Sequence, residues 1–229
     1  MKVLGIIPAR GGSKGVPGKN IKLLHALPLI GYSIRAAEGS QLTRTIVSSD
    51  SLEIIETARK LGGDVPFIRP TELAADDTPT MPVLLHALAM LSEEYDAVMV
   101  LQPTSPLRQS WHIDEAIAML EKDASADSVI SVVKVSDAHP ARMKRMENGV
   151  LIDPTFVEVV EGMRRQDLPE YYLRNGAIYL TRTQVIRQSQ SLKGMKCLGY
   201  TMSEQFSVNI DSHLDFMLAE AILANGING

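Results

Sequence analysis

Cysteine is almost absent from this chain, and its scarcity excludes two kinds of structure. Of the 229 residues, one is a cysteine, Cys197. A single cysteine rules out an internal disulfide framework and a zinc site built from cysteines, and it fits a reducing compartment such as the cytoplasm. Nothing near Cys197 indicates an activated thiol, so we expect it to be a small core residue.

An excess of positive charge is also missing. The 23 lysines and arginines are outnumbered by 27 acidic residues, which gives a formal net charge of −4. A general nucleic-acid-binding protein needs a basic surface, so we expect no nucleic-acid partner. A small anionic substrate needs only a local cluster of positive charge.

Long apolar runs and patterned histidines are absent as well. No run approaches the roughly 20 residues that cross a bilayer, and the apolar N-terminus meets Ala9-Arg10 without a cleavage-like site. The five histidines show no metal-ligand or catalytic spacing. We therefore expect a cytoplasmic protein that has no membrane partner and no catalytic histidine.

What the chain does have is enough apolar sequence for one core. Apolar residues make up 45% of it and charged residues 22%. Short β-branched runs predict strands at Val3–Ile7, Thr45–Ser48, Val65–Ile68, Ala97–Leu101, Val129–Val135 and Ala177–Leu180. Helical spacing or start signals predict helices over 28–38, 52–61, from 76–79 onward, 112–120 and 214–223.

This alternation of strands and helices predicts an α/β fold. We expect a Rossmann-like, mostly parallel sheet flanked by helices on both faces, forming a single domain over residues 1–229. Between about 139 and 174 the pattern weakens, with one β-like run at Phe156–Val160. We interpret this segment as an inserted arm or lid, and we call it the arm. Ligands of such sheets bind beyond the carboxyl ends of the strands.

The loop that follows the first predicted strand has the composition of a phosphate-binding site. Residues 8–20 read PARGGSKGVPGKN, with several glycines and the cations Arg10, Lys14 and Lys19. Glycines let backbone N–H groups turn towards an anion. The spacing matches neither the P-loop nor the dinucleotide-binding motif. Composition alone leaves two interpretations, a triphosphate cradle and a solvated turn with surface cations.

Six motifs, spread over nearly the whole chain, point to a family. They are Ile6-Ile7-Pro8-Ala9-Arg10-Gly11-Gly12-Ser13-Lys14-Gly15 with Lys19-Asn20, Val47-Ser48-Ser49-Asp50, Arg69-Pro70 with Glu72-Leu73-Ala74, Leu101-Gln102-Pro103-Thr104-Ser105-Pro106-Leu107-Arg108, Asn175-Gly176-Ala177-Ile178-Tyr179, and Asn209-Ile210-Asp211. In this order they resemble the CMP-sialic acid synthetases (acylneuraminate cytidylyltransferases). Other sugar nucleotidyltransferases share much of the first motif, whereas the fourth and fifth are more specific. The resemblance implies the nucleotidyltransferase fold.

The same resemblance implies roles for individual residues. The implied catalytic residues are Arg10, Lys14, Lys19 and Asp211. The implied nucleotide-binding residues are Ala9, Arg10, Gly11, Asn20, Arg69 and Thr80, and the implied sugar-binding residues are Gln102, Arg142, Arg165 and Tyr179. Thr80 stands where the family usually has serine, and Arg142 stands where relatives have lysine.

A divalent metal, Mg²⁺ or Mn²⁺, is also implied, with Asp211 and Asn209 as its ligands. Many relatives carry Asp-x-Asp where this chain has Asn209-Ile210-Asp211. An amide oxygen can coordinate a hard cation but brings no negative charge, so the two-carboxylate site of the family is altered here. Taken in isolation, Asp211 could instead cap the last helix together with Ser212. Asp50-Ser51 is expected to cap the helix that follows the second strand, with Asp50 as the capping residue.

The function that the resemblance implies is transfer of CMP from CTP to an acidic nine-carbon sugar, with release of pyrophosphate. N-acetylneuraminic, legionaminic and pseudaminic acids are all candidates for the acceptor. The resemblance also implies a homodimer in which the arm of one subunit reaches the sugar site of the other. Two alternatives stay open, namely a nucleotidyltransferase for Kdo or another sugar and a non-catalytic nucleotide-binding regulator.

Overall fold

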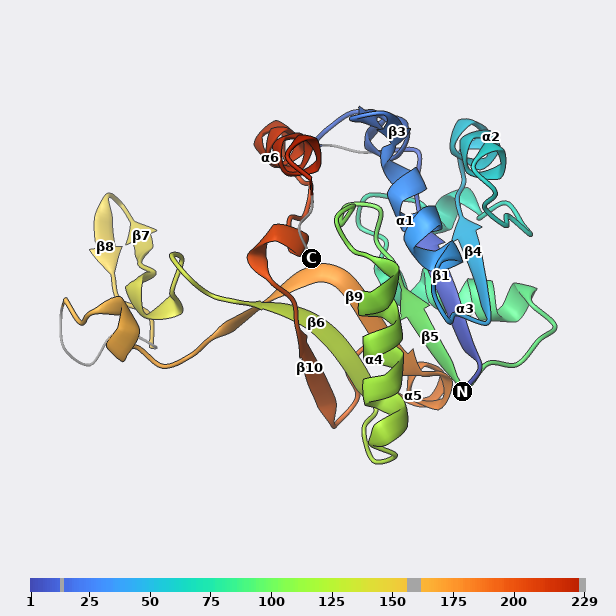
Figure 1. Ribbon diagram of the computed structural model, residues 1–229. Helices are drawn as coiled ribbons and strands as arrows, with labels where there is room; N and C mark the ends of the chain where they lie inside the picture. Colours follow the sequence, from blue (N-terminus) through green and yellow to red (C-terminus); the bar gives the residue numbers. More distant parts are fainter. Residues whose placement is uncertain (13–14, 156–161, 227–229) are drawn as a thin grey trace.

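The centre of the structure is a six-stranded sheet (Figure 1). The computed structural model describes residues 1–12, 15–155 and 162–226. Its strands lie in the order β10-β6-β9-β5-β1-β4. Their bounds are β1 (Val3–Pro8), β4 (Arg44–Ser48), β5 (Ala97–Val100), β6 (Ser128–Lys134), β9 (Tyr172–Arg182) and β10 (Cys197–Thr201). Only β9 runs antiparallel to its neighbours in this sheet, so the predicted α/β fold with a mostly parallel sheet is confirmed.

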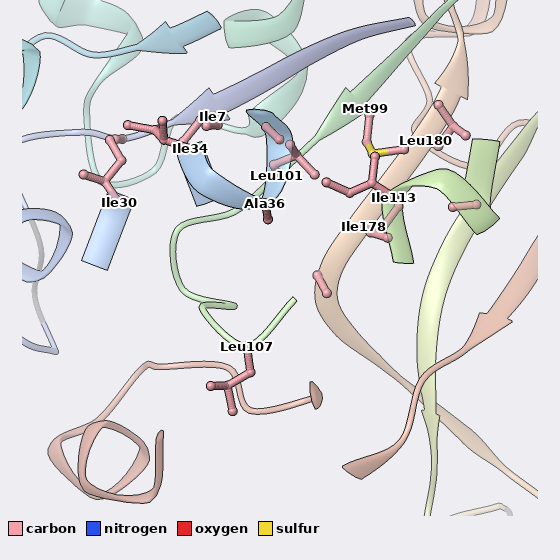
Figure 2. Packing of buried hydrophobic residues seen from close by; sticks show 14 of the residues in the cluster. Ile7, Ile30, Ile34, Ala36, Met99, Leu101, Leu107, Ile113, Ile178 and Leu180 are labelled. Atoms are coloured by element: carbon pink, nitrogen blue, oxygen red, sulfur yellow. The ribbon is translucent and has the colours of Figure 1, made fainter. Parts of the chain in front are cut away.

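Helices cover both faces of the sheet, as predicted. One face packs against α1 (Leu29–Glu38), α2 (Leu52–Lys60) and α4 (Ser110–Lys122), and the other packs against α3 (Thr80–Met90) and α5 (Thr183–Ser189). The last helix, α6 (His213–Ala224), joins the hydrophobic cluster on the first of these faces and contacts β2. In β1, Val3 and Ile7 join the first cluster, whereas Leu4 and Ile6 join the second. Successive side chains of a strand point to opposite faces, so a strand covered on both sides reads as a continuous apolar run. Figure 2 shows the first cluster at close range.

No helix in the described ranges is both long enough and apolar enough to cross a membrane. The remaining elements are short. They are β2 (Leu23–Leu24), β3 (Leu27–Pro28), β7 (Arg145–Glu147), β8 (Val150–Ile152), and the 3-10 turns η1 (Lys19–Ile21), η2 (Thr71–Leu73), η3 (Pro140–Arg142), η4 (Arg165–Asp167) and η5 (Glu204–Phe206). The sequence patterns predicted none of these elements, because two or three residues carry too little periodicity. They also missed the longer α5 and β10.

Two serines cap helices where aspartates were considered. Ser51 Oγ accepts a hydrogen bond from the Ile54 N–H at the start of α2, and Ser212 occupies the same position in α6. Of the predicted cap Asp50-Ser51, Ser51 is the residue that caps α2, and the more specific expectation that Asp50 is the cap is wrong. The carboxylates of Asp50 and Asp211 are therefore free of a capping role and can contact residues of the neighbouring loops.

Two further predictions are corrected by the structure. The segment 65–68 is not a strand, since only Asp64 forms a bridge to β4. Pro66 has no N–H to donate, so a ladder cannot continue through it. Cys197 is exposed rather than buried, because it lies on β10, the edge strand of the sheet.

The arm contains a hairpin that Figure 1 shows apart from the main sheet. Strands β7 and β8 pair antiparallel around Asn148 and Gly149, whose φ angles are +49° and +83°. Asn-Gly is the favoured sequence for a tight hairpin turn that needs two positive φ angles. The β-like run predicted at Phe156–Val160 lies outside the described residues.

His112 is a buried histidine in the first turn of α4. Its exposed fraction is 1%, and its Nδ1 accepts a hydrogen bond from the Gln109 N–H at 3.0 Å. Trp111 stacks on the imidazole ring, with 3.5 Å between the ring centroids. Burial, with a smaller contribution from the charge of Arg108, lowers the pKa of His112 to about 4.

We expect this histidine to make the fold sensitive to mild acid. The pKa of His112 is 6.5 in the unfolded chain and about 4 in the folded protein. Between these two values the unfolded chain binds more protons than the folded protein does. The contribution of the neutral His112 to stability is therefore complete above pH 6.5 and is lost as the pH falls towards 4. At pH 5 the loss is about 2 kcal/mol. His112→Asn keeps an acceptor for the Gln109 N–H without titrating. In urea unfolding, the free energy of unfolding of the wild type should fall by about 2 kcal/mol more than that of the variant between pH 7 and pH 5. Equal pH dependence in both proteins would contradict this assignment.

Candidate active site

A cleft of about 530 Å³ opens beyond the carboxyl ends of β1 and β5. Four segments line it, namely the loop after β1, residues 69–83, the loop after β5 and the segment before α6. This is the edge of a parallel sheet at which ligands bind. Among its lining residues are Arg10, Lys19, Asn20, Arg69, Thr80, Gln102, Asn209 and Asp211.

Hydrogen bonds fix the course of the loop after β1. The Ala9 N–H donates to the Ser48 carbonyl at 2.9 Å, and the buried Asn20 side chain donates to the Arg10 carbonyl at 3.0 Å. The Arg10 guanidinium lies at the cleft, where Nη1 is 2.7 Å from Asp76 Oδ1. Both side chains of this ion pair are partly exposed, and such pairs contribute only about 0–1 kcal/mol. A stronger anionic ligand can therefore replace Asp76.

The same loop closes against the segment before α6. A Cβ atom at Gly15 would lie 2.2 Å from the Asp211 carbonyl oxygen, so this close approach requires glycine. Lys19 joins the same segments, since its Nζ donates to the Ile210 carbonyl at 2.6 Å and lies 3.2 Å from Asp211 Oδ1. Lys14 lies outside the described residues.

Arg69 brings a buried positive charge to the cleft. It is 4% exposed, and its Nη2 lies 3.6 Å from Asp50 Oδ1, which also accepts a hydrogen bond from the Gly11 N–H. Its Nε and Nη2 atoms have no hydrogen-bond partner in the described part of the chain. Burial lowers the pKa of Arg69, and Asp50 partly opposes that effect. Buried donors without partners are costly, so this side chain is suited to a ligand with acceptor atoms. Thr80, half-buried in the first turn of α3, lines the same cleft.

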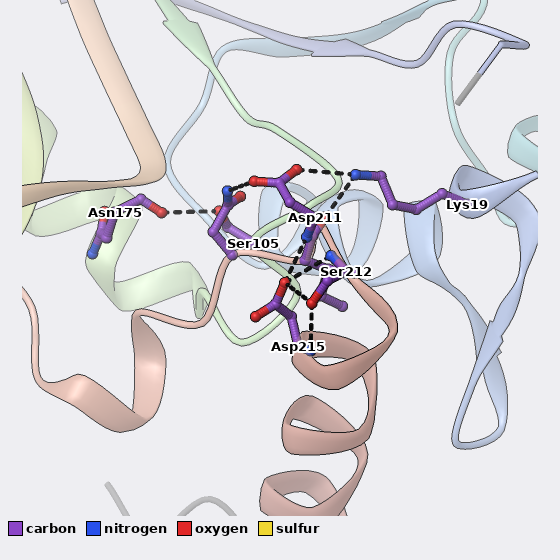
Figure 3. A network of polar contacts seen from close by, with 8 residues as sticks. Lys19, Ser105, Asn175, Asp211, Ser212 and Asp215 are labelled. Atoms are coloured by element: carbon purple, nitrogen blue, oxygen red, sulfur yellow. Dashed lines mark hydrogen bonds and ion pairs between the residues drawn. The ribbon is translucent and has the colours of Figure 1, made fainter. Parts of the chain in front are cut away.

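Asp211 presents an exposed carboxylate, which Figure 3 shows facing Lys19. The Asn209 amide donates to Asp211 Oδ2 at 2.6 Å, and its own Oδ1 is buried without a hydrogen-bond partner in the described residues. Within those residues, no group of three or more histidine, cysteine, aspartate or glutamate side chains could hold a metal ion. One carboxylate and one amide oxygen suit Mg²⁺, which keeps several waters and is commonly bound through one or two carboxylates plus substrate phosphates.

A distortion in β9 shapes the other side of the cleft. Gly176 has a φ of +78°, and the pairing of β9 with β6 shifts register beside it. A Cβ atom at this position would lie 3.0 Å from Gln102 Oε1, 3.3 Å from Asn209 Oδ1 and 3.4 Å from Ser105 Oγ. The three oxygens therefore converge on the Cα of Gly176. Ser105 also donates to the Asn175 carbonyl at 3.4 Å, which ties the loop to the strand (Figure 3).

The structure does not bring every predicted residue to this cleft. Arg142 donates to the Met163 carbonyl at 2.9 Å, and Arg165 Nη1 lies 2.7 Å from Asp137, both in or beside the arm. Tyr179 is half-buried in β9 and packs against the cluster under α3. None of the three is among the residues that line the cleft in the described chain.

Two residues, one lining the cleft and one buried behind it, received no binding or catalytic role from the sequence. Asp76 was predicted only to open a helix, yet it forms the ion pair with Arg10. Arg108 ends the fourth of the six motifs, but residue type alone does not distinguish a buried arginine from one on the surface. It is 2% exposed, and burial lowers its pKa to about 9.

Solved structures share this fold. CMP:2-keto-3-deoxy-manno-octonic acid synthetase complexed with CTP matches with a TM-score of 0.76 at 17% identity, covering 99% of this chain and 100% of that one. The 4-diphosphocytidyl-2C-methyl-D-erythritol synthase of Anaerococcus prevotii matches with a TM-score of 0.68 at 14% identity, covering 97% of this chain and 98% of that one. At these identities the likeness shows the fold alone.

Curated proteins match at higher identity. Post-translational flagellin modification protein B of Campylobacter coli is 36% identical, covering 97% of this chain and 95% of that protein. CMP-N,N'-diacetyllegionaminic acid synthase of Legionella pneumophila is 33% identical, covering 97% of each. N-acylneuraminate cytidylyltransferase of Escherichia coli is 34% identical over 96% of this chain, which spans only 52% of that protein. The resemblance inferred from the six motifs is thus confirmed. Since the cytidylyltransferase family model also matches residues 4–211, the chain belongs to the cytidylyltransferase family.

Proposed function

We propose that this protein transfers CMP from CTP to the anomeric hydroxyl of a nonulosonic acid, with release of pyrophosphate. The observation that carries the proposal is the cleft itself, which combines Arg10, Lys19 and the incompletely paired Arg69 with the exposed carboxylate of Asp211. A triphosphate requires several cations, and a divalent metal requires a carboxylate. The cationic side chains and the carboxylate lie in the same cleft.

The nucleotide is assigned to the side formed by the loop after β1 and the start of α3. Arg10 exchanges Asp76 for phosphate oxygens, and Lys19 approaches the phosphates from the opposite wall. Arg69 and Thr80 contact the cytosine or ribose, where the Arg69 donors gain acceptors. Ala9, Gly11 and Asn20 hold the backbone of this loop in place, as their hydrogen bonds indicate.

The metal is assigned to Asp211, with Asn209 supplying an amide oxygen or holding the carboxylate. Mg²⁺ or Mn²⁺ would supply neutralisation of phosphate charge and a lowered pKa for a hydroxyl that it contacts. The residues of the chain orient the reactants. The acceptor oxygen forms a bond to the α-phosphorus, the bond from that phosphorus to the oxygen it shares with the β-phosphate breaks, pyrophosphate leaves with that oxygen, and the hydroxyl proton passes to solvent water. Because the protein forms no covalent intermediate, positioning and charge stabilisation dominate.

The acceptor is assigned to the side formed by Gln102 and the Gly176 turn. The names of the relatives from Legionella pneumophila and Escherichia coli support a nonulosonic acid over Kdo. We assign the reaction to the cytoplasm, because CTP is an intracellular nucleotide and a chain with one cysteine suits a reducing compartment.

Arg142 and Arg165 are assigned to the cleft of a partner subunit. In their own chain they lie in the arm rather than in the cleft. The arm also exposes Met146, Val150 and Leu151, each by more than 60%. Clustered exposed apolar side chains mark interaction surfaces. We therefore propose a homodimer in which each arm (about 139–174) completes the partner's sugar site.

Pyrophosphate release tests the reaction. Purified protein with CTP and Mg²⁺ should release pyrophosphate with one of N-acetylneuraminic, legionaminic or pseudaminic acid, and much less with Kdo. Release with Kdo alone would assign the chain to the alternative acceptor. If folded protein that binds CTP released no pyrophosphate with any of the four acceptors, the proposal would be contradicted and the non-catalytic nucleotide-binding regulator would be favoured.

Substitution of Asp211 tests the metal assignment. The Asp211 side chain is 70% exposed, so Asp211→Ala should leave the fold and its Tm nearly unchanged while abolishing turnover. Asp64→Ala removes another exposed carboxylate, one that pairs with Arg44 outside the cleft, and it should retain activity. Mn²⁺ affinity in the presence of CTP, measured by electron paramagnetic resonance, should fall only in the Asp211 variant. Full activity of Asp211→Ala would remove this residue from the metal site.

Mixed dimers test the shared site. Arg165→Ala damages the arm and leaves the cleft intact, whereas Asp211→Ala does the reverse. Coexpression of the two chains, each inactive alone, should restore about a quarter of wild-type activity, because half of the dimers contain one intact site. The alternative outcome, a fully active monomer in analytical ultracentrifugation, would rule out the shared site.

A further inference from the structure

Arg108 is buried next to Leu107, a member of the first cluster, and it has no carboxylate beside it in the described residues. It is 2% exposed, and in the described residues it forms no ion pair within 4.0 Å. A buried charge without an opposite charge is costly, and it persists only where its hydrogen bonds compensate. The partners of Arg108 therefore indicate what the residue is for.

Those partners lie where two strands of the sheet separate. Strands β5 and β9 pair up to Val100 and Tyr179, and beyond that register the loop after β5 diverges from β9. Arg108 Nη1 donates to the Ala177 carbonyl at 2.8 Å and to the Gln102 carbonyl at 3.4 Å. One nitrogen thus bridges the two segments at the point where the ladder ends.

A third bond connects this bridge to α1. Arg108 Nη2 donates to Ser33 Oγ at 2.6 Å, and Ser33 in turn donates to the Gln102 carbonyl at 3.4 Å. Ser33 is fully buried. The Gln102 backbone is therefore fixed from two directions, by the planar guanidinium and by the helix behind it. Lysine has no planar fork and would not reproduce this geometry.

The fixed backbone sets the distance between Gln102 and the turn at Gly176. Gln102 Oε1, Ser105 Oγ and Asn209 Oδ1 converge there, and the Asn209 oxygen is buried without a partner in the described chain. Three acceptor oxygens from two loops at one glycine need accurate spacing. The side chain that provides this spacing does not line the cleft itself.

We propose that Arg108 is a positioning residue for the acceptor side of the cleft: by bridging Gln102 and Ala177 where β5 and β9 separate, it sets the spacing of the Gln102, Ser105 and Asn209 oxygens around Gly176. This inference rests on the proposed function, which assigns that side to the sugar. The CTP side depends on the loop after β1 and on residues 69–80, which Arg108 does not contact through any of these bonds.

Arg108→Lys and Ser33→Ala test this role, with Arg182→Lys as the matched control. Arg182 also donates to three backbone carbonyls, those of Leu120, Ala126 and Asp123, but at the opposite end of β9. The measurements are the acceptor KM and kcat from pyrophosphate release, the Kd for CTP from calorimetry, and the Tm. Ser33→Ala leaves the guanidinium in place and so keeps the test informative if Arg108→Lys folds poorly.

Arg108→Lys should raise the acceptor KM about tenfold or more, and Ser33→Ala should raise it about threefold, with the Kd for CTP changed by less than about twofold. Arg182→Lys should lower the Tm and leave the acceptor KM unchanged. The inference would be overturned if the acceptor KM were unchanged in both Arg108→Lys and Ser33→Ala, or if these variants lost CTP binding and acceptor binding equally. Silence of the wild type with every acceptor would overturn the proposed function first and this inference with it.

Discussion

The candidate site depends on one long-range contact, the closure of the loop after β1 against the segment before α6. Lys19 and Asp211 are 192 residues apart in sequence, yet their charged atoms lie 3.2 Å apart. Gly15 makes this approach possible because any side chain there would collide with the Asp211 carbonyl. The contact brings Lys19 and the Asp211 carboxylate into one cleft, where we propose that they bind phosphate and a divalent metal. The first strand positions one half of the cleft, and Ser212 at the start of the last helix positions the other.

Buried arginines define the two sides of this cleft in different ways. Arg69 borders the cleft, and its Nε and Nη2 have no hydrogen-bond partner in the described residues, although Nη2 lies 3.6 Å from Asp50 Oδ1, so a ligand can compensate its burial. Arg108 Nη1 donates to two backbone carbonyls and Nη2 donates to Ser33 Oγ, so only its Nε lacks a hydrogen-bond partner in the described residues. The two side chains are similarly buried, but only Arg69 is among the residues that line the cleft. We interpret the arginine that borders the cleft as a binding residue and the arginine that bridges the two segments as a positioning residue.

The sequence predicted the parts of the structure that follow from periodicity and from motifs. The main strands and helices were recognisable because β1 and β5 are continuous apolar runs and α1 has apolar residues at helical spacing. The candidate site residues between Ala9 and Asn20 were recognisable because glycines and cations cluster there. The sequence did not predict α5, the short strands of the arm hairpin, or β10, whose side chains are mostly exposed. It misplaced Cys197 because residue type alone does not reveal an edge strand. The pairing of Arg10 with Asp76 and the bridge formed by Arg108 depend on tertiary distances, which no local pattern contains.

The ion pair between Arg10 and Asp76 has a consequence for selectivity among anions. Before a nucleotide arrives, part of the cleft is occupied by the protein's own carboxylate, which acts as an internal competitor. A ligand with one phosphate exchanges one ion pair for another and gains little. In the proposed function, a nucleoside triphosphate would also reach Lys19 and the Arg69 donors that have no hydrogen-bond partner in the described residues, so it would gain more than it displaces. A weak internal contact of this kind discriminates against small phosphates while leaving the binding of the full nucleotide favourable.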